Sequence, residues 1–281
     1  MDDDNILDEI SQYKFYHRIQ LTETIVTPGN ALYVPAQNLC LQHLESLDLR
    51  EKKVLDIGCR DGLFSFKAEK MGARAVIGID NDLSKPATQF LIPFFKSNIT
   101  MIEMNLYDIR PDNFGRFDVV IFAGVLYHLR YPFWALKVIR DIMEPDGHLL
   151  IETAIWHGDP ADKAMLFCPI DGPYGNDITS CTFFNEKGLV DTMKSLGFET
   201  MCIKYLPQPK DKNASALTMK SRIEQRIKQT VKEALLKKGF TKFNLAMDRC
   251  VFHLVYRGYD EDQHLYKYWE KKHESHTLRP G

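Results

Sequence analysis

Short apolar runs alternate with helical patterns between residues 53 and 155, and this alternation restricts the fold more than any other feature of the chain. The runs have the length and the continuous apolar character of strands that are buried on both faces of a sheet. They cover residues 53–57, 74–79, 99–104, 117–123 and 148–155. Strands that are separated by helices form right-handed βαβ units, so the pattern predicts an α/β fold with a parallel sheet.

Helical patterns fill the intervals between these runs. Residues 61–71 and 132–143 carry apolar side chains at helical spacing. Between them, a helix is expected to begin near Asp82 or Ser84. We expect Pro93 to end or kink this helix, because proline lacks the N–H group that a helix interior requires.

The pattern continues toward the C-terminal end. A Glu-Pro-Asp-Gly turn at residues 144–147 precedes the fifth strand, and residues 157–182 after it are rich in Pro, Gly and Asp and are expected to form a loop. Residues 185–196 predict a helix, and residues 198–206 and 250–257 predict two further strands. The complete prediction is a mostly parallel sheet of seven strands with helices on both faces.

The sequence also predicts how the chain is divided into units. The predicted units are an N-terminal extension or lid at residues 1–50, a central domain at 51–258 with a lid-like insertion at 157–182 and a basic helical insertion at 207–248, and a polar tail at 259–281. Within the second insertion, residues 210–242 hold ten Lys or Arg against three Asp or Glu. That excess fits a solvated helix hairpin, and it also fits a surface for a phosphate-bearing partner.

Composition excludes several classes of protein. The 36 Lys and Arg against 38 Asp and Glu give a formal charge of −2, which excludes a uniformly basic coat for nucleic acid. No apolar run approaches the roughly 20 residues of a membrane helix, and the N-terminus is acidic where a secretory signal is basic. The six cysteines form no CxxC pair, so no zinc site and no disulfide framework are predicted. We therefore expect a cytoplasmic protein without membrane or metal.

The first strand ends in the segment Asp56-Ile57-Gly58-Cys59-Arg60-Asp61-Gly62. The glycines allow a ligand to approach the backbone, but the Gly-x-Gly-x-x-Gly pattern of dinucleotide-binding turns is missing. Asp56 would repel a pyrophosphate by several kcal/mol at an effective dielectric near 20, whereas it would attract an ammonium group. S-adenosylmethionine carries such an ammonium group together with a carboxylate, a ribose and an adenine.

Polar residues at the ends of the next strands suit the same cofactor. Asp80 ends the second strand, where an acid accepts hydrogen bonds from ribose hydroxyls, although it also suits the N-cap of a helix. Asn105 follows the third strand and is placed for the adenine amino group, or is a simple turn residue. Leu106 offers its backbone N–H and an apolar side chain to the adenine ring.

Four segments together resemble the class I S-adenosylmethionine-dependent methyltransferases: residues 54–59, 76–80, 117–120 and 124–129. They occur in the order and at the spacing of that family, over roughly residues 51–206 and the final strand. The resemblance implies a Rossmann-like fold, S-adenosyl-L-methionine as cofactor and methyl transfer as the activity.

A narrower resemblance includes the start of the chain. Residues 16–21, 26–29 and 60–66 are similar to the subfamily described as tRNA wobble-uridine (5-oxyacetate-type) methyl- or carboxymethyltransferase-like. Arg60 stands where the common class I motif has a glycine. In this subfamily an arginine at the position of Arg249 is a candidate for the anionic end of a ligand.

These observations give two sets of candidate site residues. The candidates for cofactor binding are Tyr16, Asp56, Gly58, Cys59, Arg60, Gly62, Asp80, Asn81, Asn105, Leu106, Ala123 and Tyr127. The candidates for catalysis are His17, Tyr127, His128 and His157. Each has an ordinary structural explanation as well: Tyr127 and His128 can pack beneath the next helix, His17 can belong to a strand, and His157 can be a solvated loop residue.

The sequence supports three functions. We expect a methyltransferase that acts on an oxygen of a small-molecule metabolite, because the chain has no Asn-Pro-Pro-Tyr-type segment after the fourth strand and no cysteine nucleophile beside a proline there. The first alternative is a tRNA wobble-uridine methyl- or carboxymethyltransferase, supported by the narrower resemblance and the basic segment. The second alternative is a non-enzymatic scaffold that keeps only the cofactor fold.

Overall fold

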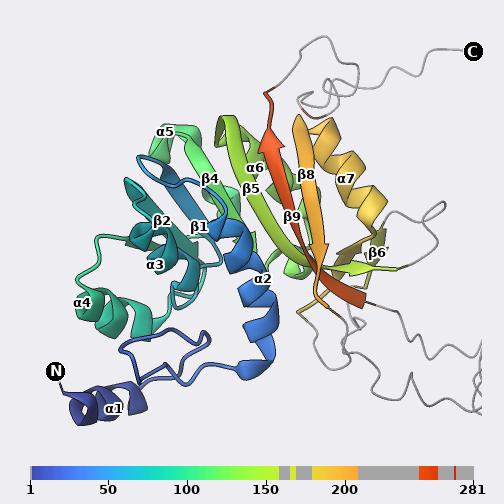
Figure 1. Ribbon diagram of the computed structural model, residues 1–281. Helices are drawn as coiled ribbons and strands as arrows, with labels where there is room; N and C mark the ends of the chain where they lie inside the picture. The colour runs from blue at the N-terminus through green and yellow to red at the C-terminus, as the bar shows by residue number, and fades with distance from the viewer. Residues whose placement is uncertain (1, 158–164, 169–178, 208–246, 259–268, 270–281) are drawn as a thin grey trace, which may run out of the picture.

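A seven-stranded sheet forms the centre of the molecule in the computed structural model, which describes residues 2–157, 165–168, 179–207, 247–258 and 269 (Figure 1). The strand order is β3-β2-β1-β4-β5-β9-β8. The strands are β1 (Lys53–Ile57), β2 (Ala75–Asp80), β3 (Thr100–Glu103), β4 (Phe117–Ala123), β5 (Met143–Trp156), β8 (Phe198–Tyr205) and β9 (Met247–Tyr256). The first five pair in parallel, and β9 is antiparallel to both of its neighbours, β5 and β8. The predicted α/β fold with a mostly parallel sheet of seven strands is confirmed.

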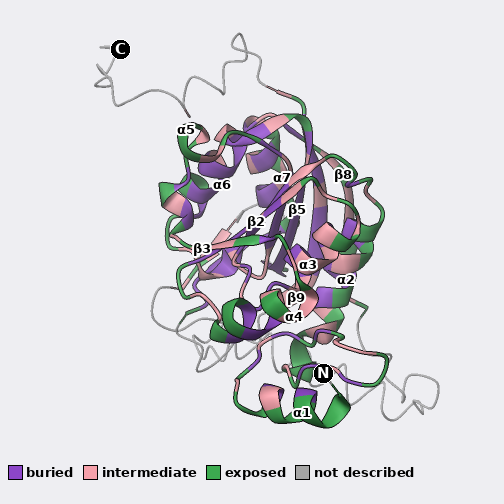
Figure 2. Ribbon diagram, turned by 90° about the vertical axis from the view of Figure 1, so that its left-hand side faces the viewer, coloured by how far each residue is buried: buried purple, intermediate pink, exposed green. Residues whose placement is uncertain are grey.

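Helices cover both faces of this sheet. On one face lie α2 (Val34–Glu45) and α3 (Leu63–Lys70), and on the other lie α6 (Pro132–Asp141) and α7 (Glu186–Ser195). Short helical segments complete the chain: α1 (Asp3–Ser11), η1 (Ala31–Tyr33), η2 (Ala87–Leu91), α4 (Ile92–Phe95), η3 (Leu106–Asp108), α5 (Pro111–Phe114) and η4 (Leu126–His128). Figure 2 shows buried strands in the interior with exposed residues on the outward faces of the helices.

The central strand β4 explains why its sequence is apolar without interruption. Phe117, Val120 and Phe122 belong to the core cluster that includes α6 and α7. Val119 and Ile121 belong to the cluster on the opposite face, with α2 and α3. Because successive side chains point to opposite faces of a sheet, a strand covered on both faces must be apolar at every position.

The predicted end of the helix at Pro93 is wrong, because the chain stays helical to Phe95. The π-helical segment η2 passes directly into α4, which contains Pro93. The wider π-helical turn before Pro93 replaces the regular α-helical bonding that this proline cannot complete. The segment ends instead at Lys96, which has the left-handed conformation at φ 50°.

The predicted turn at residues 144–147 lies inside β5, so this strand begins at Met143 and not at residue 148. Its pairing with β4 shifts between Phe117–Met143 and Val119–His148, and the residues between them form an irregular excursion. Asp146 has φ 60° within this excursion. The turn chemistry of the sequence is therefore present, but the strand continues through it.

The expected loop at residues 157–182 contains regular structure in its described part. Residues Met165–Phe167 form β6, which pairs antiparallel with β7 (Thr182–Phe184). The prediction of a loop is wrong for these residues. The remaining parts of that insertion, the basic segment at 210–242 and the tail from 259, apart from residue 269, lie outside the described residues.

The N-terminal segment packs beside the sheet as a separate apolar cluster. Ile6 and Ile10 of α1 and Phe15 of the following loop contact Phe90 and Leu91 of η2. In Figure 1, α1 and this loop lie at the lower end of the sheet, on the side to which the arrow of β8 points. Since β8 runs parallel to β5, this is the end at which the parallel strands finish. Within the described residues, no helix is long and apolar enough to cross a membrane.

Candidate cofactor and acceptor site

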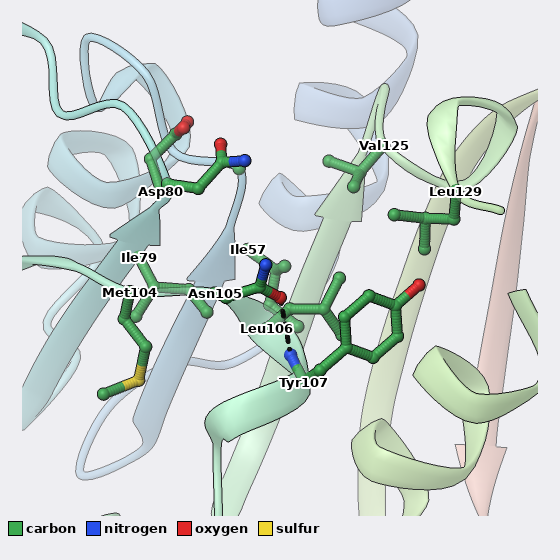
Figure 3. A pocket seen from close by; sticks show the side chains of 11 residues that line it. Ile57, Ile79, Asp80, Met104, Asn105, Leu106, Tyr107, Val125 and Leu129 are labelled. Carbon is green, nitrogen blue, oxygen red and sulfur yellow. Dashed lines mark hydrogen bonds between the residues drawn. The ribbon is translucent and has the colours of Figure 1, made fainter. Parts of the chain in front are cut away.

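A cavity of about 110 Å³ lies at the carboxyl ends of β1 and β2, beside the turns that follow β3 and β4 (Figure 3). It is lined by Ile57, Gly58, Ile79, Asp80, Asn81, Met104, Asn105, Leu106, Tyr107, Val125 and Leu129. The structure thus brings together five residues that the sequence indicates for cofactor binding: Gly58, Asp80, Asn81, Asn105 and Leu106. The carboxyl edge of a parallel sheet is the usual position of a ligand in this class of fold.

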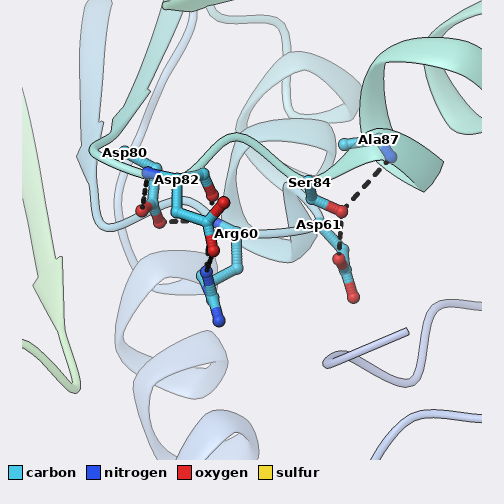
Figure 4. A network of polar contacts seen from close by, with 6 residues as sticks. All are labelled: Arg60, Asp61, Asp80, Asp82, Ser84 and Ala87. Carbon is cyan, nitrogen blue, oxygen red and sulfur yellow. Dashed lines mark hydrogen bonds and ion pairs between the residues drawn. The ribbon is translucent and has the colours of Figure 1, made fainter. Parts of the chain in front are cut away.

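Asp80 is a buried carboxylate that two backbone N–H groups hold in place. The N–H of Arg60 donates to Oδ2 at 3.1 Å, and the N–H of Asp82 donates to Oδ1 at 3.1 Å (Figure 4). A carboxylate oxygen accepts more than one hydrogen bond, so both oxygens keep capacity for a ligand. Asp80 therefore offers two fixed acceptors at the wall of the cavity.

Gly58 is required by the tight packing of the turn after β1. Its φ is 75°, and a Cβ atom at this position would lie 2.4 Å from the Cγ2 atom of Val125. The N–H groups of Gly58 and Cys59 donate to the carbonyl of Ile79, which ties the turn to the end of β2. The side chain of Cys59 is buried against Gly78, and burial raises the pKa of its thiol. Cys59 can therefore offer a ligand only its backbone.

Asp56 lies beneath the turn instead of beside the ligand cavity. Its side chain is 1 % exposed and accepts a hydrogen bond of 2.7 Å from the hydroxyl of Ser65 in α3. Burial raises the pKa of Asp56 to about 7, against the opposing effect of the hydrogen bonds from Ser65. The sequence indicates a carboxylate that contacts a cationic ligand, whereas in the structure Asp56 bonds Ser65 and is not among the residues that line the cavity.

Asn105 and Leu106 line the cavity in different ways. The Oδ1 atom of Asn105 accepts a hydrogen bond of 3.0 Å from the N–H of Tyr107, so the side chain caps η3 as well as facing the cavity (Figure 3). Leu106 is buried and supplies an apolar wall. Met104 and Tyr107 extend that wall and were not indicated by the sequence, although both are direct neighbours of the two residues that were.

A second polar group gathers near the ends of β4, β5 and β9. Arg249 donates to both carboxylate oxygens of Glu152, at 2.7 and 2.5 Å, and to the hydroxyl of Tyr127 at 2.9 Å. Its guanidinium carbon also lies 4.7 Å from the centre of the Tyr127 ring. Ala123 at the end of β4 pairs with Glu152 in the sheet. The sequence did not identify Glu152, although an acid inside the apolar run 148–155 is the signal that points to it.

Tyr16 connects the N-terminal segment to the polar group formed by Arg249, Glu152 and Tyr127. Its ring stacks on Tyr33 at 5.0 Å, and the guanidinium carbon of Arg60 lies 5.7 Å from the ring centre. Burial raises the pKa of Tyr16 to about 12, and the next contribution comes from Tyr127. Phenol rings from the N-terminal segment and from the turn after β4 therefore share one region of the site.

Asp61 fastens the N-terminal segment to the turn after β1. Its buried carboxylate accepts hydrogen bonds from the N–H groups of Tyr16 at 2.5 Å and His17 at 2.7 Å. It also accepts one from the hydroxyl of Ser84 at 2.5 Å (Figure 4). The sequence did not assign a role to Asp61. Its only signal was its position in the segment 60–66, which carries the narrower resemblance.

A larger cavity of about 520 Å³ lies between the N-terminal segment and the loop after β2. Its walls include Tyr16, Arg60 and Asp61 together with Asp82 and Ser84. Arg60 has the left-handed conformation at φ 45°, and its guanidinium group lies 3.2 Å from the carboxylate of Asp82. The residue that replaces the usual glycine is thus held by its own ion pair, on the side of the turn away from β4.

The candidate histidines do not share one environment. His17 is buried between Tyr16 and Phe64, and its Nδ1 atom has no hydrogen-bond partner among the described residues. Burial lowers the pKa of His17 to about 4, although Asp61 acts in the opposite direction. A neutral imidazole at physiological pH follows.

His128 and His157 occupy two further positions. The Nδ1 atom of His128 lies 3.1 Å from the hydroxyl of Thr179, and its ring lies 4.3 Å from that of Tyr127. His157 lies 2.6 Å from the carboxylate of Asp248. Along the chain, His157 follows Glu152 by five residues. At about 3.3 Å per strand residue, this separates His157 from Glu152 by roughly 16 Å.

Comparison with known proteins identifies the family. The family described as "Methyltransferase domain" matches residues 35–203. A tRNA U34 carboxymethyltransferase of Helicobacter pylori is 34% identical over 124 residues, which are 43% of this chain and 46% of that protein. The enzyme of the same name from Azotobacter vinelandii is 34% identical over 119 residues, 40% of this chain and 36% of that protein. The chain thus matches less than half the length of these curated relatives.

Solved structures share the fold at low sequence identity. The 1,6-didemethyltoxoflavin-N1-methyltransferase of Burkholderia thailandensis has a TM-score of 0.53 and 17% identity, covering 81% of this chain and 79% of that one. The N-terminal domain of EvdMO1, crystallised in the presence of SAH and D-fucose, has a TM-score of 0.58 and 15% identity, covering 92% and 98%. The family match extends over more than half of the 281 residues, and the sheet order agrees with it. The chain belongs to the methyltransferase-domain family and has the Rossmann-like fold of the class I S-adenosylmethionine-dependent methyltransferases.

Proposed function

We propose that this chain transfers a methyl group from S-adenosyl-L-methionine to an oxygen atom of a small-molecule acceptor. One observation carries the cofactor assignment. Asp80 presents two oriented carboxylate oxygens at the wall of a cavity whose other sides are mainly apolar. A ribose with two neighbouring hydroxyls and a flat purine ring match that combination of groups.

The remaining residues of the cavity fit the parts of this cofactor. Ile79, Met104 and Leu106 supply apolar surface for adenine, and Asn105 supplies a polar edge. The turn at Gly58 allows the amino-acid end to approach the backbone, because no Cβ atom stands there. Asp56 beneath that turn favours a cationic ligand when it is ionised.

When bound, the sulfonium of S-adenosylmethionine supplies an activated methyl group. The protein must then hold the acceptor oxygen in line at about 3 Å and exclude water. Tyr16 and Tyr127 contribute aromatic rings to this region, and each ring faces a guanidinium group, of Arg60 and of Arg249 respectively. Arg249 keeps the phenol of Tyr127 in a fixed orientation through its hydrogen bond of 2.9 Å.

The buried His17 favours an acceptor that needs no strong base. A histidine with a pKa of about 4 is neutral at pH 7 and is a weak proton acceptor. An oxygen that is already anionic at neutral pH, as in a carboxylate or an enolate, reacts without losing a proton to the enzyme. We therefore place acidic oxygen acceptors ahead of alcohols.

Calorimetry with S-adenosylmethionine tests the cofactor assignment. We expect Asp80→Asn to weaken binding by about 10- to 100-fold, because hydrogen bonds to a charged group contribute ~1.5–3 kcal/mol. The matched control is Asp82→Asn in the same loop, which removes only the exposed ion pair with Arg60 and should change the affinity less than threefold. Equal affinities of wild type and Asp80→Asn, or no binding by the wild type, would contradict the proposal.

Transfer of a labelled methyl group to a fractionated cell extract tests the acceptor class. We expect label in the small-molecule pool and none in the RNA pool. Label in the RNA pool alone would replace the small-molecule proposal. Cofactor binding without transfer to either pool would instead support a non-enzymatic scaffold.

A tRNA wobble-uridine modifier remains the second candidate because of the relatives named tRNA U34 carboxymethyltransferase. Transfer of a carboxymethyl group would bring an additional carboxylate into the site. Arg249 is a cation near the phenols, but Glu152 binds it through two oxygens, so the pair has no net charge. This pairing supports methyl over carboxymethyl transfer. A carboxylated analogue of S-adenosylmethionine that binds more tightly than the parent cofactor would reverse the preference.

A further inference from the structure

Three potential metal ligands meet on the α2 face of the sheet, away from the cofactor cavity. They are His43 of α2, Cys202 of β8 and His253 of β9, and their ligand atoms lie within 4.8 Å of one another. The Sγ atom of Cys202 lies 3.9 Å from the Nδ1 atom of His43. His148 of β5 adjoins the group, with its Nδ1 atom 2.9 Å from the Nε2 atom of His253.

The sheet register explains this meeting of distant residues. His253 is paired with Cys202 in β8 and with Leu150 in β5. His148 precedes Leu150 by two positions and so points to the same face as Leu150, next to His253. His43 reaches this face from the last turn of α2, which packs across β5 and β9. Four elements that are remote in the sequence each contribute one ligand.

The state of these side chains suits metal ligation. His43 is 3 % exposed, and its Nε2 atom has no hydrogen-bond partner among the described residues. The other ring nitrogen, Nδ1, is the one that lies 3.9 Å from the Cys202 thiol, so His43 can bind an ion of this cluster through Nδ1. An imidazole binds a metal through an unprotonated ring nitrogen, which each of the three histidines can supply.

We propose that His43, Cys202, His253 and His148 form a structural zinc site. Imidazole nitrogens and thiolates are the ligand types of tetrahedral structural zinc sites, with Zn–N of about 2.0–2.1 Å and Zn–S of about 2.3 Å. The ligand atoms of His43, Cys202 and His253 lie within 4.8 Å of one another, so their side chains must rotate toward a common centre on binding. On binding, the Cys202 thiol releases its proton to solvent, and the proton shared by His148 and His253 moves to an outer ring nitrogen.

The position indicates a structural role and not a catalytic one. His148 precedes Glu152 by four residues on β5, which corresponds to about 13 Å. The metal would join α2 to the antiparallel part of the sheet. Lys204 beside His43, and Lys52 and Arg257 beside His148, oppose a cation, while Asp146 favours it. The thiolate of Cys202 is therefore the decisive ligand.

Titration of the tag-free protein with Co²⁺ and Zn²⁺ tests the site. We expect one equivalent of Co²⁺, with the intense d–d bands of tetrahedral coordination and a thiolate charge-transfer band, displaced by one equivalent of Zn²⁺. Cys202→Ser should abolish the charge-transfer band and weaken Zn²⁺ binding at least tenfold, and His253→Gln should weaken it similarly. Cys168→Ser, at a partly buried cysteine outside the cluster, should leave both unchanged. No stoichiometric metal, an octahedral spectrum, or equal affinities of wild type and Cys202→Ser would overturn the proposal.

Thermal unfolding distinguishes zinc binding to the folded protein from zinc binding to the unfolded chain. Zn²⁺ should raise the melting temperature of the wild type and of Cys168→Ser, because it binds only the folded form. It should leave that of a folded Cys202→Ser protein unchanged. A decrease of the wild-type melting temperature on addition of Zn²⁺ would mean binding to the unfolded chain and would overturn the site.

Discussion

Two neighbouring carboxylates, Asp56 and Asp80, have different surroundings although they are the same type of residue. Both belong to the carboxyl-terminal parts of adjacent strands. Two backbone N–H groups hold Asp80 at the ligand cavity. Asp56 is held by Ser65 of α3, whose hydroxyl donates to its Oδ2 atom at 2.7 Å, and its side chain is buried. Asp80 thus faces the cavity, and Asp56 does not.

Asp56→Asn should increase the stability of the protein without cofactor above pH 7. The pKa of Asp56 is raised to about 7 in the folded state, against 3.8 as its ordinary value. The folded state therefore binds more protons than the unfolded state between about pH 4 and 7, so this residue's contribution to stability is lost as pH rises through 7. An asparagine has no charge to bury, and the variant should melt several degrees higher at pH 8 but not at pH 4.

The same substitution should remove a pH dependence of cofactor affinity. Ionised Asp56 attracts the cationic cofactor, so wild-type affinity should rise several-fold between pH 6 and pH 8. Calorimetry on Asp56→Asn should give a nearly constant affinity over that interval. A variant that is destabilised at pH 8, or that keeps the wild-type pH profile, would show that Asp56 is ionised far below pH 7.

At the scale of elements, the N-terminal segment depends on contacts that no local pattern encodes. Asp61 bonds the N–H groups of Tyr16 and His17 across 45 and 44 residues of sequence. The hydroxyl of Thr27 accepts from the N–H of Ile19 and donates to the carbonyl of His17, which closes the loop on itself. One carboxylate therefore fixes a segment that carries two candidate site residues.

Asp61→Ala should release this segment while the central sheet stays folded. Lys14 and Arg18 lie within it and are exposed, so trypsin cleavage there reports how often the segment opens. Loss of hydrogen bonds to a buried carboxylate costs at least ~1.5 kcal/mol, which predicts a cleavage rate raised at least tenfold. Asp61→Asn keeps one acceptor oxygen, so its cleavage rate should lie between those of the wild type and Asp61→Ala. Asp112→Ala, at an exposed acid of α5, is the control.

Unchanged cleavage in Asp61→Ala would mean that the apolar contacts of α1 hold the segment without Asp61. Circular dichroism should show that the variant keeps its helices and strands. A global loss of structure would instead place Asp61 in the support of the sheet.

Elements buried on two faces were predictable from the sequence, and elements defined by tertiary contacts were not. The apolar run 117–123 identifies β4 because burial on both faces requires it. The continuation of the predicted helix past Pro93 and the short pair β6–β7 were missed for physical reasons. A π-helical turn accommodates the proline, and three-residue strands are too short for alternation to be recognised.

At the scale of the whole molecule, the order of the strands could be predicted from the sequence, and the register between them could not. The order of a parallel sheet brings the carboxyl ends of β1, β2 and β3 together, so Gly58, Asp80 and Asn105 could be grouped from their positions at the ends of strands alone. Contacts between β5 and β9 depend on register, and Glu152 with Arg249 spans 97 residues. Such pairs became visible only when the register was known.

Salt dependence distinguishes the two acceptor classes at the scale of the whole molecule. A formal charge of −2 gives no general attraction to nucleic acid, so transfer to a small acceptor should change less than about threefold between 50 and 200 mM salt. A tRNA enzyme that contacts six or more phosphates would lose about a thousandfold or more in tRNA affinity over the same interval. Binding of bulk tRNA and methyl transfer, measured at both salt concentrations, give the comparison. A steep loss of tRNA binding that parallels a loss of transfer would assign the site to RNA, because only counterion release from a phosphate backbone produces that slope.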